Sequence, residues 1–121
     1  GQMQRIHEIV LEANGTGRAA VVPGASAESV DAAARQVISG YGYGPEFFHR
    51  TGHGIGLQEH EPPYIVRGND LRLVSGMTFT VEPGIYIQGV GGVRIEDDVV
   101  VTGAGVETLT TLDRTPFVIR P

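Results

Sequence analysis

Apolar residues recur at the period of an α-helix in the first forty residues of the chain. Four of them stand at i, i+3, i+4 and i+7: Ile6, Ile9, Val10 and Ala13. Because Asn14-Gly15 follows as a stop signal, the pattern predicts an amphipathic helix over roughly residues 3–14. A second apolar stripe, between a capping Ser26 and a terminating Gly40, predicts a second helix. Its members are Val30, Ala33, Ala34, Val37 and Ile38.

The pattern changes after a linker of glycine, tyrosine and proline at residues 40–45. From about Phe47 the chain has the character of turns and short strands. Residues 77–82 alternate apolar and polar side chains with the period of a half-buried strand, which places Glu82 on the polar face. Two helices followed by antiparallel strands predict an α+β fold.

A second alternation brings two further polar residues together. Apolar and polar side chains alternate again in residues 93–96, so we expect Arg94 and Glu96 on one side of a strand that continues to residue 102. Pro83 would end the preceding strand, which leaves the Glu82 carboxylate at the end of a sheet, beside a cleft.

Length and composition exclude several classes of function. The 121 residues offer room for one domain, and 40% hydrophobic with 19% charged residues is ordinary for a soluble globular protein. A net charge of −5 without a basic cluster argues against a nucleic-acid partner. No apolar run approaches the ~20 residues that span a bilayer, so no membrane role is expected. The lack of cysteine excludes a disulfide framework and a thiolate metal site, and it fits a cytoplasmic location.

The residues with catalytic potential gather after position 47. Three of the four histidines lie in the stretch FFHRTGHGIGLQEHEPP: His49, His53 and His60. Together with Glu82 and Glu96, they offer imidazole and carboxylate ligands for a hard to borderline divalent ion. Spacing alone does not choose among Mn²⁺, Zn²⁺, Co²⁺ and Fe²⁺, and solvated glutamates are the alternative. His7, on the polar side of the first helix, is expected to be a structural or surface residue.

Other motif interpretations are weaker. Residues 60–63, HEPP, resemble the start of a zinc-protease HExxH, but position 64 is not histidine and proline would break the helix that this motif requires. The linker at 40–45 lacks the lysine of a phosphate-binding P-loop and follows a helix instead of a strand. Asp97 and Asp98 are expected to be a strand-end or hydrogen-bonding pair, with the option that Asp97 orients Glu96.

Three sequence blocks resemble the signatures of the pita-bread metallopeptidases, in the branch of Xaa-Pro aminopeptidases and Xaa-Pro dipeptidases (prolidases). They are HRTGHGIGLQEHEPP, GMTFTVEPGIY and GGVRIEDDVVVT. The resemblance extends from the first helix to about Thr110. His49, four residues before His53, and Arg94, two before Glu96, favour the proline branch over methionine aminopeptidases. The fold that the resemblance implies is the C-terminal half of a pita-bread domain.

The resemblance also implies a role for each site residue. The metal ligands would be His53, Glu82 and Glu96. Glu96 would bridge two divalent ions, Mn²⁺ in the first place with Co²⁺ or Zn²⁺ as alternatives, while Glu82 would accept a proton from the attacking water. His60 would stabilise the tetrahedral intermediate or assist proton transfer, and the substrate end would be shaped by His49, His60 and Arg94. The implied reaction is metal-dependent hydrolysis before proline, in peptides with proline at the second position.

The departure from the family pattern is a missing pair of ligands. Family members have five, and the first two are aspartates on a hairpin before the first helix; Asp31, Asp70 and Asp97 do not stand there. We therefore expect residues 1–121 to be part of a longer catalytic domain. Alone, they should bind at most one ion, lack activity and form a homodimer through exposed apolar surface. A creatinase-like hydrolase and a non-catalytic binding module on the same fold are the alternatives, and the retained ligand residues speak against both.

Overall fold

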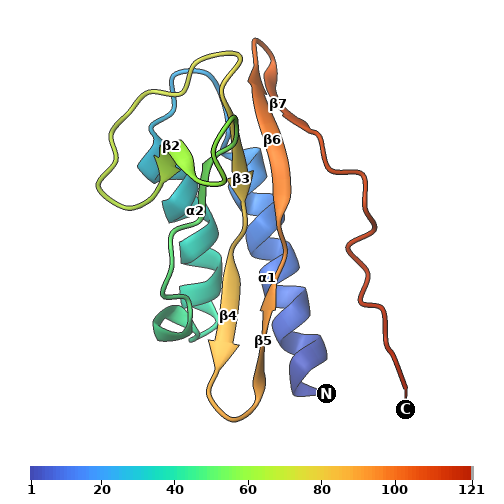
Figure 1. The fold of residues 1–121 in the computed structure, drawn as a ribbon. Coiled ribbons are helices and arrows are strands. Elements are labelled where there is room, and N and C mark those ends of the chain that lie inside the picture. The colour runs from blue at the N-terminus through green and yellow to red at the C-terminus, as the bar shows by residue number, and fades with distance from the viewer. Residues whose placement is uncertain (121) are drawn as a thin grey trace.

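The computed structural model describes residues 1–120, which form two helices packed against a long antiparallel ribbon of strands (Figure 1). The helices are α1 (Gln2–Ala19), α2 (Ala27–Gly40) and a 3-10 turn, η1 (Gly44–Glu46). The strands are β1 (Gly52–Gly54), β2 (Glu61–Ile65), β3 (Thr78–Val81), β4 (Gly84–Ile87), β5 (Gly91–Arg94), β6 (Asp97–Thr102) and β7 (Gly105–Thr108). The predicted order of helices first and antiparallel strands afterwards is confirmed. No helix in the described residues is long and apolar enough to cross a membrane.

The strands form two sheets, and two stretches of the chain, β3 to β4 and β5 to β6, run from one sheet into the other. A five-stranded sheet has the order β2-β1-β3-β6-β7, and a two-stranded sheet pairs β4 with β5. β3 leads into β4 and β5 leads into β6, so the small sheet extends the large one, as Figure 1 shows. Pairing of β3 with β6 ends at Val81↔Asp97, and pairing of β4 with β5 begins at Gly84↔Arg94. Glu82 and Glu96 lie in the gap between the two sheets.

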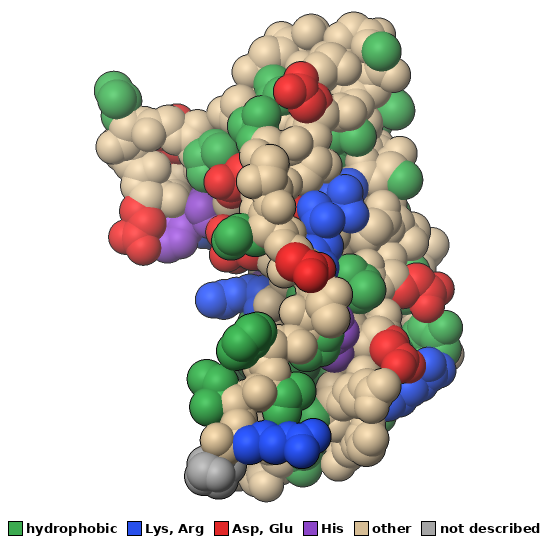
Figure 2. Space-filling view, turned by 90° about the vertical axis from the view of Figure 1, so that its right-hand side faces the viewer, with side chains coloured by type: hydrophobic (Ala, Val, Ile, Leu, Met, Phe, Trp, Pro, Cys, Tyr) green, Lys and Arg blue, Asp and Glu red, His purple; other side chains and the backbone are tan. Residues whose placement is uncertain are grey.

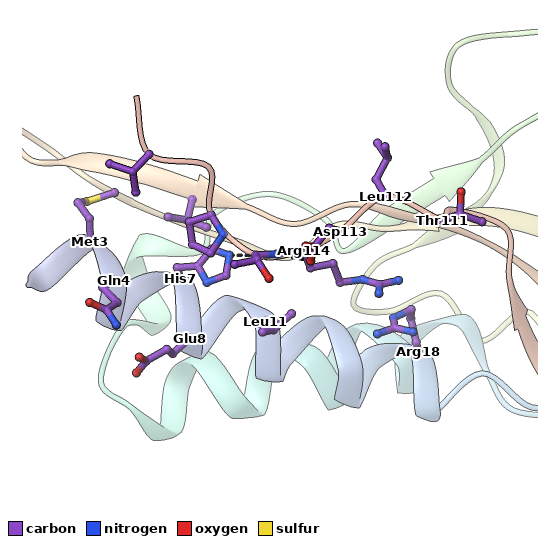
Figure 3. Close-up of a pocket in the computed structure, with 14 residues that line it drawn as sticks. Met3, Gln4, His7, Glu8, Leu11, Arg18, Thr111, Leu112, Asp113 and Arg114 are labelled. Atoms are coloured by element: carbon purple, nitrogen blue, oxygen red, sulfur yellow. Dashed lines mark hydrogen bonds between the residues drawn. The ribbon is translucent and has the colours of Figure 1, made fainter. Parts of the chain in front are cut away.

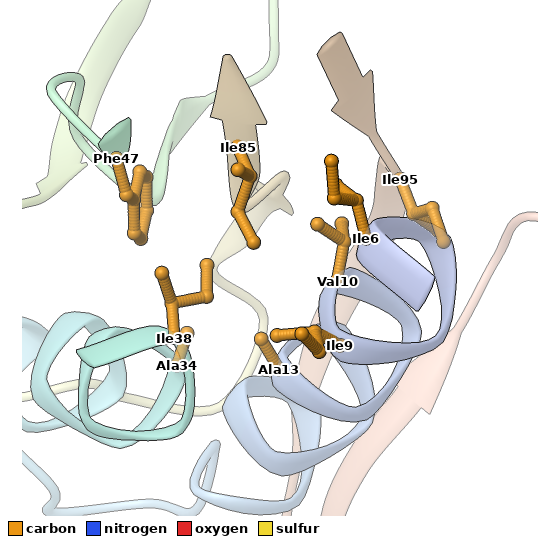
Figure 4. Close-up of a cluster of buried hydrophobic side chains, with 9 residues drawn as sticks. All are labelled: Ile6, Ile9, Val10, Ala13, Ala34, Ile38, Phe47, Ile85 and Ile95. Carbon is orange, nitrogen blue, oxygen red and sulfur yellow. The ribbon is translucent and has the colours of Figure 1, made fainter. Parts of the chain in front are cut away.

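Two apolar clusters hold the helices to this ribbon. The first joins α1 and α2 to the two-stranded sheet, as Figure 4 shows: Ile6, Ile9, Val10, Ala13, Ala34, Ile38, Phe47, Ile85 and Ile95. The second lies against the five-stranded sheet: Val21, Ala27, Val30, Ile65, Leu73, Phe79, Val81, Val99 and Val101. Burial of each large aliphatic or aromatic member stabilises the fold by roughly 1.5–3 kcal/mol. The packing therefore fixes α1 against the segments that carry both glutamates.

The first helix is longer than predicted. It continues through Asn14-Gly15 to Ala19, because Asn14 makes tertiary contacts and does not end the helix. Asn14 is fully buried, and its side chain makes tertiary hydrogen bonds. A Cβ on Gly17 would lie 3.1 Å from the Cγ1 atom of Val81. The glycine thus lets α1 approach β3 closely, which offsets its poor helix propensity.

Two smaller predictions also need correction. Ser26 occupies the N-cap position of α2 with an extended backbone, but its side chain makes no capping hydrogen bond. The strand expected from residue 93 to residue 102 is divided at Ile95-Glu96 into β5 and β6, where the chain passes from one sheet to the other. The linker at 40–45 contains the end of α2, a turn at Gly42 and the start of η1.

Candidate metal centre

His53 occupies the middle of the short strand β1, between β2 and β3. Glycines on both sides allow this close approach: a Cβ on Gly52 would lie 1.7 Å from the Thr80 carbonyl oxygen, and one on Gly54 would lie 2.2 Å from that of Pro62. The His53 Nδ1 atom is 2.9 Å from the Gly54 carbonyl oxygen, so Nδ1 carries the proton and donates it. The Nε2 lone pair is therefore left for a ligand.

The two glutamates converge on that nitrogen. One ligand atom from each of His53, Glu82 and Glu96 lies within 4.8 Å of the other two. The Oε2 atom of Glu82 is 3.6 Å from His53 Nε2. Desolvation, followed by the neighbouring Glu82 carboxyl, raises the pKa of Glu96. An imidazole nitrogen with a free lone pair and two crowded carboxylates is a donor set that fits a divalent cation, whose charge would relieve the repulsion.

A cavity of about 580 Å³ opens beside these ligands. Its lining is Phe48, His49, Arg50, His53, His60, Glu82, Tyr86 and Arg94. Glu96 faces an adjoining cavity of about 370 Å³, which it shares with His53, His60, Glu82 and Arg94. The structure thus brings all six predicted site residues to one place. Figure 2 shows histidine and acidic side chains at a hollow on the edge of the molecule.

His60 lies on the turn before β2 and is exposed. Its ring stands edge-on to that of His53, with ring centroids 4.4 Å apart and an interplanar angle of 79°. The segment that follows is a strand, not a helix, which is consistent with the rejection of an HExxH motif. The imidazole of His60 is therefore free to face a molecule bound beside His53.

His49 is held in one tautomer by two hydrogen bonds. Its Nδ1 atom donates to the Arg50 carbonyl oxygen at 2.7 Å, and Nε2 accepts from the Tyr86 hydroxyl at 2.9 Å. Burial lowers the pKa of His49, and the positive charges of Arg94 and Arg35 lower it further. The ring is therefore neutral at pH 7. Sequence reasoning missed Tyr86, although its position on β4, two residues beyond Gly84 on the face of Glu82, was an available signal.

An ion pair on α2 holds the segment that carries His49. The carboxylate of Asp31, which is 1% exposed, accepts hydrogen bonds from Arg35 at 2.9 and 3.1 Å and from the Thr51 hydroxyl at 2.7 Å. Arg35 also donates to the carbonyl oxygens of Phe47 and His49, at 2.7 and 2.8 Å. Residues 47–51 are therefore held against α2 by the hydrogen bonds of Asp31 and Arg35.

Asp97 does not orient Glu96, contrary to the option raised above. It points to the opposite side of the strand, where it accepts two hydrogen bonds from Arg114 and lies 3.6 Å from Arg18. Burial alone would raise the pKa of Asp97, but the hydrogen bonds from Arg114, the nearby Asn14 amide and the charge of Arg18 outweigh it, and the pKa is lowered. The pair anchors the C-terminal segment to β6.

A larger cavity, of about 1110 Å³, lies away from the candidate metal centre, between α1 and that C-terminal segment (Figure 3). His7 lies there, and its Nε2 atom is 2.9 Å from the Arg114 carbonyl oxygen. None of the predicted site residues lines this cavity. His7 is therefore a structural residue. The two smaller cavities are the candidate site because the predicted site residues line them.

Known proteins resemble this chain in both sequence and fold. The sequence profile of metallopeptidase family M24 matches residues 1–103. An Xaa-Pro dipeptidase of Lactobacillus helveticus is 50% identical over 113 residues, which are 93% of this chain and 31% of that protein. The crystal structure of X-Pro aminopeptidase from Thermotoga maritima MSB8 superposes with a TM-score of 0.94 and 46% identity, over 98% of this chain and 34% of that one. Xaa-Pro dipeptidase from Bacillus anthracis gives a TM-score of 0.95 and 45% identity, over 98% and 33%. The predicted fold is thereby confirmed, and the chain spans about a third of the length of these relatives.

Proposed function

The chain belongs to metallopeptidase family M24, and from this premise we propose that it forms part of a proline-specific exopeptidase that hydrolyses the peptide bond before proline. The substrates would be dipeptides or longer peptides with proline at the second position. The observation that carries the proposal is the convergence of His53, Glu82 and Glu96 on one point beside a cavity. Because the chain spans about a third of its relatives, the activity is proposed for the whole protein.

His53, Glu82 and Glu96 would hold the divalent cation, with Glu96 shared between two ions in the complete site. A mixed set of imidazole and carboxylate suits Mn²⁺ first and Co²⁺ or Zn²⁺ as alternatives. Such ions, when bound, lower the pKa of water and polarise the scissile carbonyl group. Three ligands hold an ion less tightly than five, so residues 1–121 alone should bind at most one ion and lack turnover.

Glu82 and His60 would move protons and stabilise charge. The Glu82 carboxylate lines both cavities, so it can accept a proton from water in either of them. The exposed imidazole of His60, edge-on to His53, can donate a hydrogen bond to the oxyanion that forms when the carbonyl carbon is attacked.

His49 and Arg94 would define the substrate end. Both ring nitrogens of His49 are already engaged, by Arg50 and Tyr86, so its role is to shape the wall of the cavity and not to transfer protons. Arg94 makes no hydrogen bond or ion pair within residues 1–120 and lines both cavities, so its guanidinium is available for a carboxylate of a short peptide.

Hydrolysis of Gly-Pro and of an Xaa-Pro-Xaa tripeptide tests the proposal. We expect the full-length protein to turn over one or both with Mn²⁺ and neither after chelation, and residues 1–121 alone to turn over neither. Glu96→Gln should abolish turnover, whereas Glu107→Gln, an exposed glutamate on β7, should not. A full-length Glu96→Gln variant with the wild-type rate would refute the metal-binding assignment.

Homodimer formation is a separate proposal. The C-terminal segment exposes several large apolar side chains: Leu112, Phe117, Val118 and Ile119. Exposed apolar surface of this kind favours association. Sedimentation of residues 1–121 as a monomer across a range of concentrations would refute the dimer.

A further inference from the structure

Asn14 connects the two segments that carry the metal-binding carboxylates. Its side chain is fully buried on α1, and Nδ2 donates to the carbonyl oxygens of Val81 at 3.1 Å and Ile95 at 3.2 Å. These two residues immediately precede Glu82 and Glu96. We propose that Asn14 is a positioning residue that sets the spacing and direction of the two glutamates, an inference that rests on the proposed metal-binding function.

These two hydrogen bonds, the Asn14 tether, lie where backbone pairing between the strands is interrupted. Pairing of β3 with β6 stops at Val81↔Asp97 and pairing of β4 with β5 starts at Gly84↔Arg94. Between these points the structure shows one backbone hydrogen bond across the gap, from Ile95 N–H to the Pro83 carbonyl oxygen, and it is long at 3.4 Å. The Asn14 amide group therefore adds two shorter hydrogen bonds across the gap in the sheet at the position of the ligands.

The direction of the amide group is fixed by Arg18. The Arg18 Nε atom donates to Asn14 Oδ1 at 2.9 Å, which identifies the oxygen and leaves both N–H bonds for the two carbonyls. Arg18 in turn donates to the Thr108 hydroxyl on β7 and lies 3.6 Å from Asp97. Aspartate at position 14 would have the same shape but no donor, so it would face both carbonyl oxygens with a carboxylate.

The expected effect is on metal affinity. Groups that orient metal ligands without touching the ion typically contribute 10–100-fold to affinity. We expect Asn14→Ala to weaken Co²⁺ binding by about that factor. Asn14→Asp, which keeps the volume and removes the donors, should act at least as strongly.

The matched control is Val10→Ala. Val10 is fully buried one turn earlier on the same helix and has no hydrogen bond to the ligand segments, so its truncation destabilises the fold without cutting the tether. Two measurements on residues 1–121 separate the cases. One is Co²⁺ titration followed by visible absorption, and the other is ¹⁵N relaxation of the Glu82 and Glu96 amides without metal.

The tether predicts weaker Co²⁺ binding and more mobile Glu82 and Glu96 amides in Asn14→Ala, with neither change in Val10→Ala. If Asn14→Asp does not fold, the alanine pair decides alone. Equal Co²⁺ affinity and equally rigid amides in the two alanine variants would overturn the inference. If the wild-type chain binds no more Co²⁺ than Glu96→Gln, the proposed metal site in this chain fails. In that case the relaxation data alone decide whether Asn14 positions the two glutamates: mobile amides support the tether and rigid ones overturn it.

Discussion

Arg35 and Asp31, four residues apart on α2, form an ion pair in which the carboxylate is buried and the partly exposed cation also holds the backbone of the histidine-bearing segment. Removal of the Arg35 guanidinium would leave the buried Asp31 carboxylate uncompensated and the Phe47 and His49 carbonyl oxygens without this donor. The pair therefore links the stability of the helix to the shape of the cavity beside the candidate metal centre.

We predict that Arg35→Met destabilises the chain by about 3 kcal/mol, because the buried Asp31 carboxylate loses its counter-charge. Urea denaturation measures the change. Arg5→Met is the matched control, since Arg5 pairs with Glu8 at 3.4 Å on the exposed surface and such pairs contribute about 1 kcal/mol at most. Equal losses from the two substitutions would contradict the structural role of Arg35.

Acid should weaken the fold through Asp97. The folded-state pKa of this carboxyl is lowered, so its stabilising contribution is present above the unfolded value of about 3.9 and disappears as pH falls through the folded value. Arg114→Gln removes a main cause of the shift. We expect that variant to show a flatter loss of stability than the wild type from about pH 5 downwards. Unfolding curves across that range test this, with Arg120→Gln as the control on the same segment.

The crowded carboxylates of the candidate metal centre should lower the stability of the metal-free fold at neutral pH. The pKa of Glu96 is raised, so the stability linked to its protonated form is present below the unfolded value of about 4.3 and is lost as pH rises through the folded value. We predict that Glu96→Gln is more stable than the wild type in chelator at pH 7, by at most about 1 kcal/mol because the side chain is exposed. Thermal unfolding measures the difference, and Mn²⁺ should stabilise only the wild type.

Two glycines should respond in opposite directions to alanine. Gly52→Ala would place a Cβ against the Thr80 carbonyl oxygen, and we expect a loss of about 3 kcal/mol or more together with loss of ion binding. Gly15→Ala, inside α1 with open space around it, should stabilise the chain by roughly 0.5–1 kcal/mol. Urea denaturation of both variants is sufficient, and a stable Gly52→Ala chain would contradict the close packing of β1.

Local patterns in the sequence predicted the elements whose cause is local. The period of the apolar residues identified both helices, and alternation around Phe79 identified β3, because burial on one face is visible in neighbouring positions. The end of the first helix was predicted wrongly at Asn14, since the partners of this residue, Val81 and Ile95, are distant in sequence.

The same distinction applies to the candidate site. The six predicted site residues lie in long, specific sequence blocks, so the resemblance predicted all of them, and the structure brings them together. Alternation from Glu82 places Tyr86 on the face of the site, but its partner, His49, is 37 residues away and no local pattern indicated the pairing. The partner of Asp97 was missed for a similar reason, since Arg114 belongs to an irregular segment whose path no periodic pattern describes.

Gly15 follows Asn14 directly, and this Asn-Gly sequence makes the Asn14 side chain susceptible to deamidation. In an Asn-Gly sequence the glycine nitrogen can attack the asparagine side-chain carbonyl carbon with little steric hindrance, and the amide nitrogen leaves as ammonia. Water then opens the resulting succinimide ring to aspartate or isoaspartate. Within α1 the Gly15 nitrogen belongs to the helical backbone and the Asn14 amide is held by three partners, so the two groups are kept apart. Each opening of the helix releases them. Deamidation of Asn14 would therefore accumulate with the age of the molecule, at a rate set by how often α1 opens.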